Sequence, residues 1–355
     1  MVDFLIIGGG IAGISAAARL SALGSVTVLE QESALGYHAS GRSAALYERN
    51  YGKPSTIALN TASLTFHQDA GVLGPRGFLL LGRDGEDAAF EADRDYMQLE
   101  DCGTKAALKL FPILNPDVIT RAAHDPEAWD IDTDLLLQSF AKTAMTNGAS
   151  IITHAPVDAI ARTATGWAVM SKDTYEARVI VNAAGAWVDQ IAELAGITPL
   201  GFTPLRRSMG RIPAPGGHDV SDWPMIFGPG ETWYAKPDAG ALIVSPADED
   251  LMTPHDAFAD DMVLAEGFAR YEEHVTEPVT RLLSSWAGLR TFAPDRQLVL
   301  GPSPEDAQFI WCAGQGGYGM QSAPGASQLL ADVISGAQPA LEPDMVAELS
   351  PARFT

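Results

Sequence analysis

One segment near the amino terminus, the glycine-rich run GGGIAG at residues 8–13, restricts the possible folds more than any other feature of this sequence. It follows directly on the apolar residues 3–7, which the pattern predicts to be a fully buried strand. Residues 14–23 are rich in good helix formers, and Gly24 is a suitable stop before a second strand at residues 25–30. Together these segments predict a βαβ unit.

The glycines of this unit have the spacing of a dinucleotide-binding turn. Gly8 allows the tight turn, Gly10 lets the backbone come close to a pyrophosphate, and Gly13 lets the helix pack against the sheet. The diphosphate would then lie at the helix N-terminus. Glu30 ends the second strand, where a carboxylate can accept hydrogen bonds from the adenosine ribose and would repel a 2′-phosphate. A chance turn would lack this context, so we interpret the segment as a dinucleotide site.

Three further segments, far apart in the chain, extend this site. Residues 36–45 supply small side chains, hydroxyls and one guanidinium. Residues 178–187 run from a strand through small residues to a helix, and residues 309–319 join a buried strand to a second glycine-rich turn, before a helix at residues 320–334. Such turns direct backbone N–H groups at a ligand. A nicotinamide dehydrogenase usually holds its cofactor in one contiguous domain, so this distribution favours FAD, with the second turn against the flavin ring.

The composition is that of a globular enzyme with a large excess of acid. The 45 acidic and 23 basic residues give a formal charge of −22, which repels nucleic acid and anionic lipid headgroups. The apolar residues 4–23 lack a basic leader and are interrupted by glycines and Arg19, so we expect folded core and no integral membrane segment. The two cysteines predict neither a disulfide framework nor a metal site, and favour a cytoplasmic location. A peripheral position at the inner face of the membrane is the alternative, although no basic amphipathic helix supports it.

Five motifs follow one another along the chain: GGGIAG at 8–13, GYHASGRSAA at 36–45, VNAAGAW at 181–187, WAGLRTF at 286–292 and AGQGGYGMQ at 313–321. This order resembles that of the D-amino acid oxidase superfamily of flavoproteins. The likeness extends over nearly the whole chain and is greatest to the bacterial D-arginine dehydrogenases, with IDTD at 131–134, RRS at 206–208, DWPM at 222–225 and YAKPDAG at 234–240. The motifs are specific together and weak singly.

The resemblance implies a two-lobed α/β fold, in which a glutathione-reductase-like Rossmann domain for FAD is interrupted by a substrate domain with a mostly antiparallel sheet. We expect an FAD-binding domain formed by residues 1–75, 130–200 and 285–355, and a substrate-binding domain formed by residues 76–129 and 201–284. Strand-like runs at residues 233–236 and 241–245, separated by Pro, Asp and Gly turns without a helix, agree with antiparallel pairing.

Oxidation of an α-amino acid needs a cation for the carboxylate, a neutral amine, and the Cα hydrogen aimed at flavin N5. Arg290 and Arg207 are the candidates for the cation, because a planar guanidinium can hold a carboxylate bidentately and both match family positions with that role. Arg206 is the rival of Arg207, since neighbouring strand residues face opposite ways unless a bulge intervenes. Either arginine could instead form a structural ion pair with one of the many acids.

The resemblance also implies roles for other residues. Tyr51 and Tyr234 match pocket tyrosines whose hydroxyls contact a lid, a water or the substrate carboxylate, and Gly317 completes the expected catalytic set. The positions expected to contact FAD are Gly8, Gly10, Ile11, Ala12, Gly13, Glu30, Gln31, Arg42, Ser43, Ala44, Val157, Ala184, Gly185, Trp187, Gly288, Gly316, Gly317, Tyr318, Gly319 and Met320.

The FAD is expected to be bound non-covalently. Residues 290–294 contain no cysteine, whereas sarcosine-oxidase-like relatives carry a cysteine near this segment that attaches FAD. Cys312 is expected to be an inert apolar filler of its strand, and His38 a structural residue or a neighbour of the cofactor rather than a base.

Two positions depart from the D-arginine pattern. Leu46 stands where the family member has a pocket histidine, and Phe78 stands where it has the glutamate that receives the substrate guanidinium. An apolar residue cannot compensate a buried cation. The substrate side chain is therefore expected not to be strongly cationic, unless Asp84 or Glu86 supplies the missing charge.

The leading hypothesis is FAD-dependent oxidation of a small D-amino acid to an imino acid, which water hydrolyses to a 2-oxo acid and ammonia. The electrons would pass to a quinone, an electron-transfer protein or oxygen. A secondary-amine oxidase of the sarcosine or glycine type, or a 2-hydroxy acid dehydrogenase, would use the same cofactor and carboxylate clamp. A flavin-binding module without turnover is the alternative from another class of protein.

Overall fold

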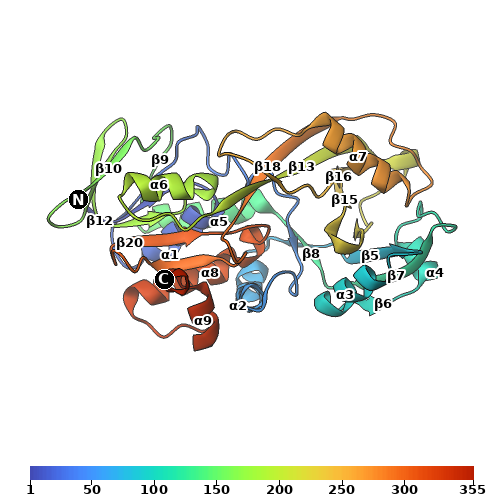
Figure 1. The fold of residues 1–355 in the computed structure, drawn as a ribbon, viewed down its shortest axis with the longest axis horizontal. Coiled ribbons are helices and arrows are strands. Elements are labelled where there is room, and N and C mark those ends of the chain that lie inside the picture. Colours follow the sequence, from blue (N-terminus) through green and yellow to red (C-terminus); the bar gives the residue numbers. More distant parts are fainter.

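The computed structural model describes all of residues 1–355, which form two lobes side by side (Figure 1). Both ends of the chain lie in the same lobe, at the left of Figure 1. One lobe is built on an eight-stranded sheet and the other on a nine-stranded sheet. This mixed α/β architecture confirms the fold class expected from the sequence.

The eight-stranded sheet has a parallel centre. Its order is β10-β11-β12-β1-β2-β9, and β20 pairs with β12 and β19. The pairs of β1, β2, β9, β12 and β20 among themselves are parallel, whereas β10, β11 and β19 add antiparallel pairs at the edges. The strands are β1 (Val2–Ile7), β2 (Val26–Leu29), β9 (Ser150–Ile152), β10 (Ala159–Arg162), β11 (Trp167–Met170), β12 (Thr174–Asn182), β19 (Val299–Pro302) and β20 (Phe309–Ala313).

Alternate residues of β1 pack on opposite faces of this sheet. Phe4 and Ile6 belong to the core formed with helices α1 (Ile11–Leu20), α5 (Thr133–Thr146) and α8 (Gly319–Ser335). Leu5 and Ile7 belong to the core of the other face, which includes Val188 and Ile191 of α6 (Val188–Leu194). Because both faces are covered, the strand has to be apolar throughout, which accounts for the unbroken apolar run before the glycines.

The glycine-rich turn brings α1 into close contact with β1 and the end of β12. A Cβ atom at Gly13 would lie 1.9 Å from the Gly8 carbonyl oxygen, and one at Gly8, where φ is +112°, would lie 2.4 Å from the Ala183 carbonyl oxygen. Helix α1 begins at Ile11, inside the glycine-rich run, so the predicted start at residue 14 is wrong. The low helix propensity of glycine is overridden here because only glycine permits this close packing.

The nine-stranded sheet is almost entirely antiparallel. Its order is β17-β13-β16-β15-β14-β5-β7-β6, with β18 also paired to β13, and only β5 and β14 run parallel. The strands are β5 (Phe78–Arg83), β6 (Glu100–Asp101), β7 (Ile119–Asp125), β13 (Thr203–Pro213), β14 (Met225–Phe227), β15 (Tyr234–Asp238), β16 (Ala241–Ser245), β17 (Asp250–Leu251) and β18 (Ser284–Phe292).

Strands β13 and β18 lie where the two lobes meet (Figure 1). They pair over nine consecutive residues, from Thr203 opposite Phe292 to Arg211 opposite Ser284. The sequence assigns residues from 285 onward to the FAD-binding domain, whereas β18 is a strand of the nine-stranded sheet. Its partner lies far away in the sequence, so local patterns do not reveal this pairing. The other domain boundaries stay a prediction.

A third, small sheet has the order β3-β8-β4. It consists of β3 (Leu46–Tyr47), β4 (Leu73–Pro75) and β8 (Trp129–Ile131). The remaining helices are α2 (Pro54–Asp69), α3 (Asp87–Met97), α4 (Thr104–Leu110), α7 (Asp261–Glu272) and α9 (Pro343–Leu349), and the short 3-10 turns are η1 (Gly185–Trp187), η2 (Pro215–Gly217), η3 (Pro229–Glu231) and η4 (Pro351–Phe354).

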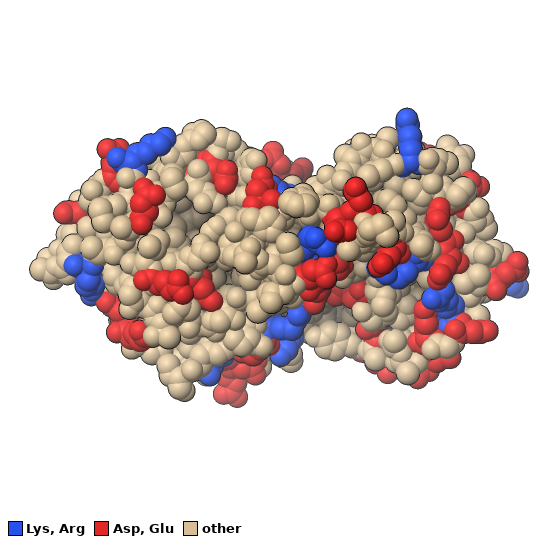
Figure 2. All heavy atoms as spheres, turned by 45° about the horizontal axis from the view of Figure 1, so that its top comes forward, with Lys and Arg blue, Asp and Glu red and all other residues tan.

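Acidic side chains cover much of the surface. On the face shown in Figure 2, Asp and Glu are spread over both lobes and over the waist between them. None of the helices is both long and apolar enough to cross a bilayer.

Candidate active site

A groove begins at the carboxyl edge of the eight-stranded sheet, the edge at which open α/β sheets bind ligands. The residues that follow β1, β2, β12 and β20 all line it: Gly8, Glu30, residues 183–187 and residues 314–317. Four segments that are distant in the sequence therefore meet at one place, as the parallel sheet requires.

The groove consists of three adjoining cavities. The first and second cavities share Gly10, Ser40, Arg42 and Gly288, among other residues. The second and third cavities share Ser43, Arg290 and Gly317. The groove thus continues from the eight-stranded sheet to the underside of the nine-stranded sheet.

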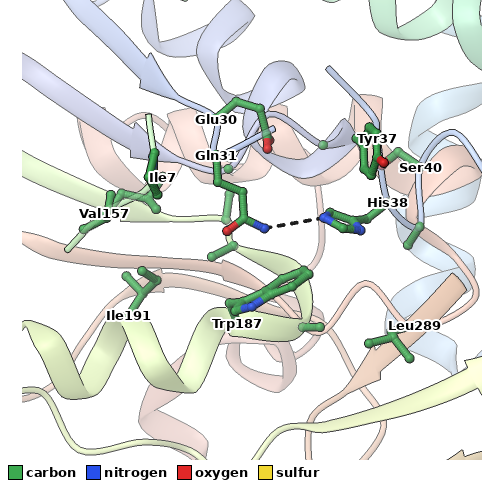
Figure 3. A pocket seen from close by; sticks show the side chains of 18 of the residues that line it. Ile7, Glu30, Gln31, Tyr37, His38, Ser40, Val157, Trp187, Ile191 and Leu289 are labelled. Carbon is green, nitrogen blue, oxygen red and sulfur yellow. Dashed lines mark hydrogen bonds between the residues drawn. The ribbon is translucent and has the colours of Figure 1, made fainter. Parts of the chain in front are cut away.

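The first cavity lies around the end of β2 (Figure 3). The buried Glu30 carboxylate accepts hydrogen bonds from Gly9 N (2.6 Å) and Glu32 N (2.8 Å), which fix its position and leave lone pairs for ligand hydroxyls. Gln31 lies 3.4 Å from the His38 ring, against which the Trp187 ring packs at 4.7 Å. The expected residues Val157, Ala184 and Gly185 also line this cavity.

Arg42 lines the groove, but most of its donors are already used. Its Nη1 donates to the carbonyl oxygens of Ala257 (2.8 Å) and Ala287 (3.0 Å), and Nη2 donates to Asp256 (2.5 Å). The guanidinium therefore fastens residues 256–257 and β18 over the groove. This use differs from the diphosphate contact that the sequence suggests for the segment 36–45.

The second cavity is lined by the start of α1, by β18 and by the second glycine-rich turn. Both polar atoms of the Gln315 side chain and the Thr291 hydroxyl are buried without a hydrogen-bond partner. Buried polar atoms in proteins are almost always paired, so these groups are available to a polar ligand in the cavity. The expected residues Ile11, Ala12, Ser43, Gly288, Gly316, Gly317, Gly319 and Met320 line it.

These residues fit an extended dinucleotide such as FAD. Glu30 would hold the adenosine ribose, and the N-terminus of α1, next to Gly10, would hold the diphosphate. A Cβ atom at Gly10 would contact only Ser40 Oγ, at 3.2 Å, so its other side is open to the groove. Gln315 and Thr291 would hydrogen bond the flavin end.

The third cavity is where the nine-stranded sheet covers the groove. It has a volume of about 80 Å³, compared with roughly 10–15 Å³ for one water on the same measure, so it suits a small organic molecule. Its lining residues are Ser43, Ala44, Ala45, Leu46, Glu48, Tyr51, Phe78, Met97, Met225, Phe227, Glu231, Tyr234, Arg290 and Gly317.

Arg207 and Arg290, called the arginine pair below, converge on Glu231. The Oε1 atom of Glu231 accepts hydrogen bonds from Arg207 Nη1 (2.9 Å), from Arg290 Nη1 (3.2 Å) and from the Tyr51 hydroxyl (3.0 Å). Burial would raise the pKa of Glu231, but Arg290 and then Arg207 lower it below its ordinary value. Burial would lower the pKa of Arg290, but Tyr51, Tyr234 and Glu231 raise it. Glu231 and Arg290 are therefore both charged.

The ion pairs at Glu231 extend to two further residues. Arg207 also pairs with Glu249 (3.2 Å), which in turn pairs with Arg296 (2.8 Å). Three arginines thus face two glutamates, Glu231 and Glu249. A carboxylate brought by a ligand would find several guanidinium groups here as counter-charges.

The structure separates Arg206 from Arg207. Arg206 points to the opposite side of β13, where it pairs with Asp248 (3.0 Å) and Asp250 (2.5 Å). Arg207 lines the second cavity and reaches Glu231. The strand contains no bulge at this point, so the alternation of side chains holds.

The two expected tyrosines both line the third cavity. The Tyr51 hydroxyl is engaged with Glu231, whereas the Tyr234 hydroxyl is buried without a hydrogen-bond partner and lies within the reach of a ligand. Gly317 lies directly under Arg290, since a Cβ atom at Gly317 would be 2.9 Å from Arg290 Nη1.

Three expected FAD contacts differ from expectation. Gly13 does not line the groove, because it packs α1 against the turn below it. Tyr318 lines none of the three cavities and packs on Tyr51, with ring centroids 5.1 Å apart. Ala44 lines only the third cavity.

Sequence reasoning did not find Glu231, Glu48 or Gln315 as site residues. Glu231 follows two glycines in a turn and Glu48 lies among polar residues, so neither has a distinctive pattern. Gln315 stands inside the second glycine-rich turn, and its position in this motif could have identified it as a residue of the cofactor site. Cys312 lies in β20 and is buried, and burial raises the pKa of its thiol to about 12, as for an inert side chain.

Comparison with known proteins agrees with this geometry. The family profile DAO, FAD dependent oxidoreductase, matches residues 3–333. FAD-dependent oxidoreductase domain-containing protein 1 of Bos taurus is 24% identical over 396 residues, which cover 94% of this chain and 81% of that protein. These findings show the wider family, and the finer likeness to D-arginine dehydrogenases is not among them.

Solved structures share the whole fold. L-proline dehydrogenase from P. horikoshii has a TM-score of 0.85 and 21% identity, covering 99% of this chain and 97% of that chain. Glycine oxidase from Geobacillus kaustophilus has a TM-score of 0.83 and 20% identity, covering 99% and 98%. The groove at the carboxyl edge of the sheet and its buried polar atoms agree with the profile match, which extends over nearly the full length. The chain belongs to the DAO family of FAD-dependent oxidoreductases.

Proposed function

We propose that this protein oxidises the Cα–N bond of a small D-amino acid, giving an imino acid that water hydrolyses to a 2-oxo acid and ammonia. The observation that carries the proposal is the position of the arginine pair: Arg290 and Gly317 form the boundary between the second and third cavities. A carboxylate held there would lie next to the place where the flavin ring fits.

The residues of the chain would bind and orient the substrate. Arg290, assisted by Arg207, would hold the substrate carboxylate, and the unpartnered Tyr234 hydroxyl would donate a hydrogen bond to it. The apolar wall of the third cavity would exclude water from the reacting carbon. FAD, when bound, supplies the acceptor for the hydride that leaves Cα. The electrons would then pass to a quinone, an electron-transfer protein or oxygen.

The D configuration rests on the sequence resemblance, and the mode of FAD binding and the domain division are likewise part of this proposal. FAD would be bound non-covalently, in contact with the cavity-lining residues named above. The FAD-binding domain would comprise residues 1–75 and 130–200 and the part of the chain after β18. The substrate-binding domain would comprise residues 76–129 and 201–292, with β18 included for its pairing with β13.

A second candidate is oxidation of glycine or of a secondary amine. The solved structures of similar fold include a glycine oxidase and an L-proline dehydrogenase, and the substrate each name gives is an α-amino acid with a carboxylate next to the amine. The arginine pair would hold any of these carboxylates, as it would hold that of a 2-hydroxy acid.

The test is reduction of the bound flavin without oxygen. The purified yellow protein is mixed anaerobically with D- and L-amino acids, sarcosine, glycine, proline and 2-hydroxy acids, and the flavin absorbance is followed. Fast bleaching by D-amino acids alone supports the proposal. Faster bleaching by sarcosine or proline selects the second candidate, and no bleaching by any compound would indicate a flavin-binding module without turnover.

A further inference from the structure

The third cavity combines apolar side chains with an acid that the arginine pair does not use. Phe78, Met97, Met225 and Phe227 line it together with Glu48. Glu48 follows directly on β3, so its backbone is held by the small sheet next to the cavity. A carboxyl group in such surroundings calls for a partner, because desolvation of a polar group without a hydrogen bond is unfavourable.

Only one of the two oxygens of the Glu48 carboxyl group has a hydrogen-bond partner in the protein. Glu48 is 3% exposed. Its Oε1 atom accepts a hydrogen bond from Asn50 N at 2.9 Å, whereas its Oε2 atom is buried and has no hydrogen-bond partner. The backbone N–H of Glu48 is held by Gln321 Oε1 at 3.1 Å. The carboxyl group is therefore fixed, and one oxygen remains for a ligand.

A second acid lies beside Glu48. Strand β7 pairs with β5 so that Asp125 stands opposite Phe78. Burial raises the pKa of Glu48 to about 8, and the neighbouring Asp125 carboxyl acts in the same direction, while Asn50 N and Arg49 act in the opposite direction. Two acids and a single nearby arginine give this end of the cavity an excess of negative charge when both acids are ionised.

We propose that Glu48 receives a cationic group, an ammonium or a guanidinium, at the end of the substrate side chain. This assignment rests on the proposed function, since it takes the arginine pair as the site of the α-carboxylate. The substrate would then be held at both ends of the third cavity, with its carboxylate at Arg290 and its cation at Glu48. Phe78 of β5 stands where the D-arginine dehydrogenases have a glutamate, and here Glu48, after β3, would supply the carboxylate instead. The proposal therefore differs from the prediction that the substrate side chain is not strongly cationic.

Binding would also move a proton. Without a ligand Glu48 is mostly neutral at pH 7 and ionises poorly beside Asp125. A bound cation would stabilise the carboxylate, so the carboxyl proton would leave to solvent as the cation enters. A neutral side chain of the same length would gain neither the ion pair nor the hydrogen bond to Oε2.

The test compares D-lysine with D-norleucine, which has the same carbon chain without the ammonium group. Flavin reduction by each is measured anaerobically for the wild type, for Glu48→Gln and for Glu127→Gln, an exposed acid near Asp125 that serves as control. We expect the wild type to favour D-lysine, and Glu48→Gln to raise the D-lysine concentration for half-maximal rate by about tenfold or more. For D-norleucine, Glu48→Gln should change the concentration for half-maximal rate by less than about threefold. Glu127→Gln should leave this concentration unchanged for both substrates.

The ratio of the two substrates distinguishes recognition from a structural role. The assignment of Glu48 is overturned, while the proposed function stands, in either of two cases. In the first, Glu48→Gln raises the concentration for half-maximal rate equally for both substrates. In the second, the wild type reduces its flavin equally well with both. If no amino acid reduces the flavin, the proposed function fails and this assignment fails with it. Flavin content and thermal midpoint establish that each variant is folded.

Discussion

The Glu231 carboxylate lies between the two guanidinium groups of the arginine pair, with Oε1 at 2.9 Å from Arg207 Nη1 and 3.2 Å from Arg290 Nη1. It therefore occupies the position at which a substrate carboxylate is proposed to bind. Its φ angle is +54°, in the left-handed region that non-glycine residues seldom adopt. The neighbouring Gly230 N donates to Asp93 at 2.6 Å, so the turn is held in this conformation by α3.

Replacement of Glu231 by Gln should destabilise the protein when no ligand is present. The buried Arg207 and the partly buried Arg290 would lose a shared counter-charge, and because the Glu231 side chain is 35% exposed the cost should be about 1–2 kcal/mol. Added carboxylates such as acetate or benzoate should raise the thermal midpoint of Glu231→Gln more than that of the wild type. Equal shifts in the two proteins would show that the arginine pair does not bind external carboxylates.

Replacement of Arg207 should affect substrate use more than replacement of Arg206. Arg207→Met removes a cation next to the carboxylate site. The value of kcat/KM for the substrate should fall roughly 30-fold, which corresponds to a loss of about 2 kcal/mol of transition-state stabilisation. Arg206→Met, on the opposite side of β13, should lower the thermal midpoint through Asp248 and leave KM nearly unchanged. Steady-state kinetics check both variants, and the reverse order of effects would contradict the site.

A methyl group at Gly317 should displace Arg290. The added Cβ atom would lie 2.9 Å from Nη1, closer than real Cβ atoms approach a neighbour, so the guanidinium has to move. We expect Gly317→Ala to raise KM by about tenfold while FAD is retained, because misplacement by about 1 Å has effects of this order or larger. Gly74→Ala is the control, since its Cβ atom would approach nothing closer than 4.0 Å.

Two glycines of the first turn should respond differently to the same change. At Gly13 the new Cβ atom would lie 1.9 Å from the Gly8 carbonyl oxygen, so Gly13→Ala should prevent α1 from packing and yield little folded protein. Gly10→Ala should fold, because only Ser40 Oγ is near, but it should bind FAD weakly. Circular dichroism and flavin absorbance separate these outcomes, and a yellow, stable Gly13→Ala protein would refute the packing argument.

The stability of the protein should depend on pH through Glu48. The pKa of this carboxyl is raised to about 8 in the folded protein from 4.5, so between these values the folded state binds more protons than the unfolded state. The contribution of Glu48 to stability is therefore present below pH 4.5 and is lost as the pH rises to 8.

The Glu48→Gln variant has no carboxyl group at this position, so its stability does not depend on this titration. The free energy of unfolding of the variant, relative to the wild type, should increase between pH 5 and pH 8 by on the order of 2 kcal/mol. Urea unfolding at the two pH values, without substrate, measures the difference, with Glu127→Gln as the control. A difference that is the same at both pH values would mean that Glu48 does not titrate in this range.

The sequence predicts the cofactor groove well because its signals are local. The glycines at 8, 10 and 13 and the strand-to-helix turns at 183–187 and 314–317 each combine a backbone requirement with a short motif. The parallel sheet then brings these turns to one edge, so their mutual position follows from the topology.

The substrate side of the groove depends on contacts that no local pattern records. Which of Arg206 and Arg207 faces the cavity is decided by the register of β13 with β18. Glu231 reaches the arginine pair because Asp93 of α3 fixes its turn. Glu48 meets Asp125 only because β7 lies next to β5. These relationships arise from non-local packing, and the sequence could not supply them.

The interleaved strand order has a consequence for how the protein is made. Val2 of β1 pairs with Ala177, and Ile180 of β12 pairs in turn with Phe309. On the ribosome, β1 emerges together with its neighbour β2 but long before its other neighbour, β12, and β12 waits in turn for β20 in the last part of the chain. Contacts of such long sequence separation slow folding and prolong the exposure of apolar strands. The eight-stranded sheet cannot be completed until β19 and β20 have emerged, so a chain truncated before them should be a target for chaperones and proteases rather than a partial enzyme.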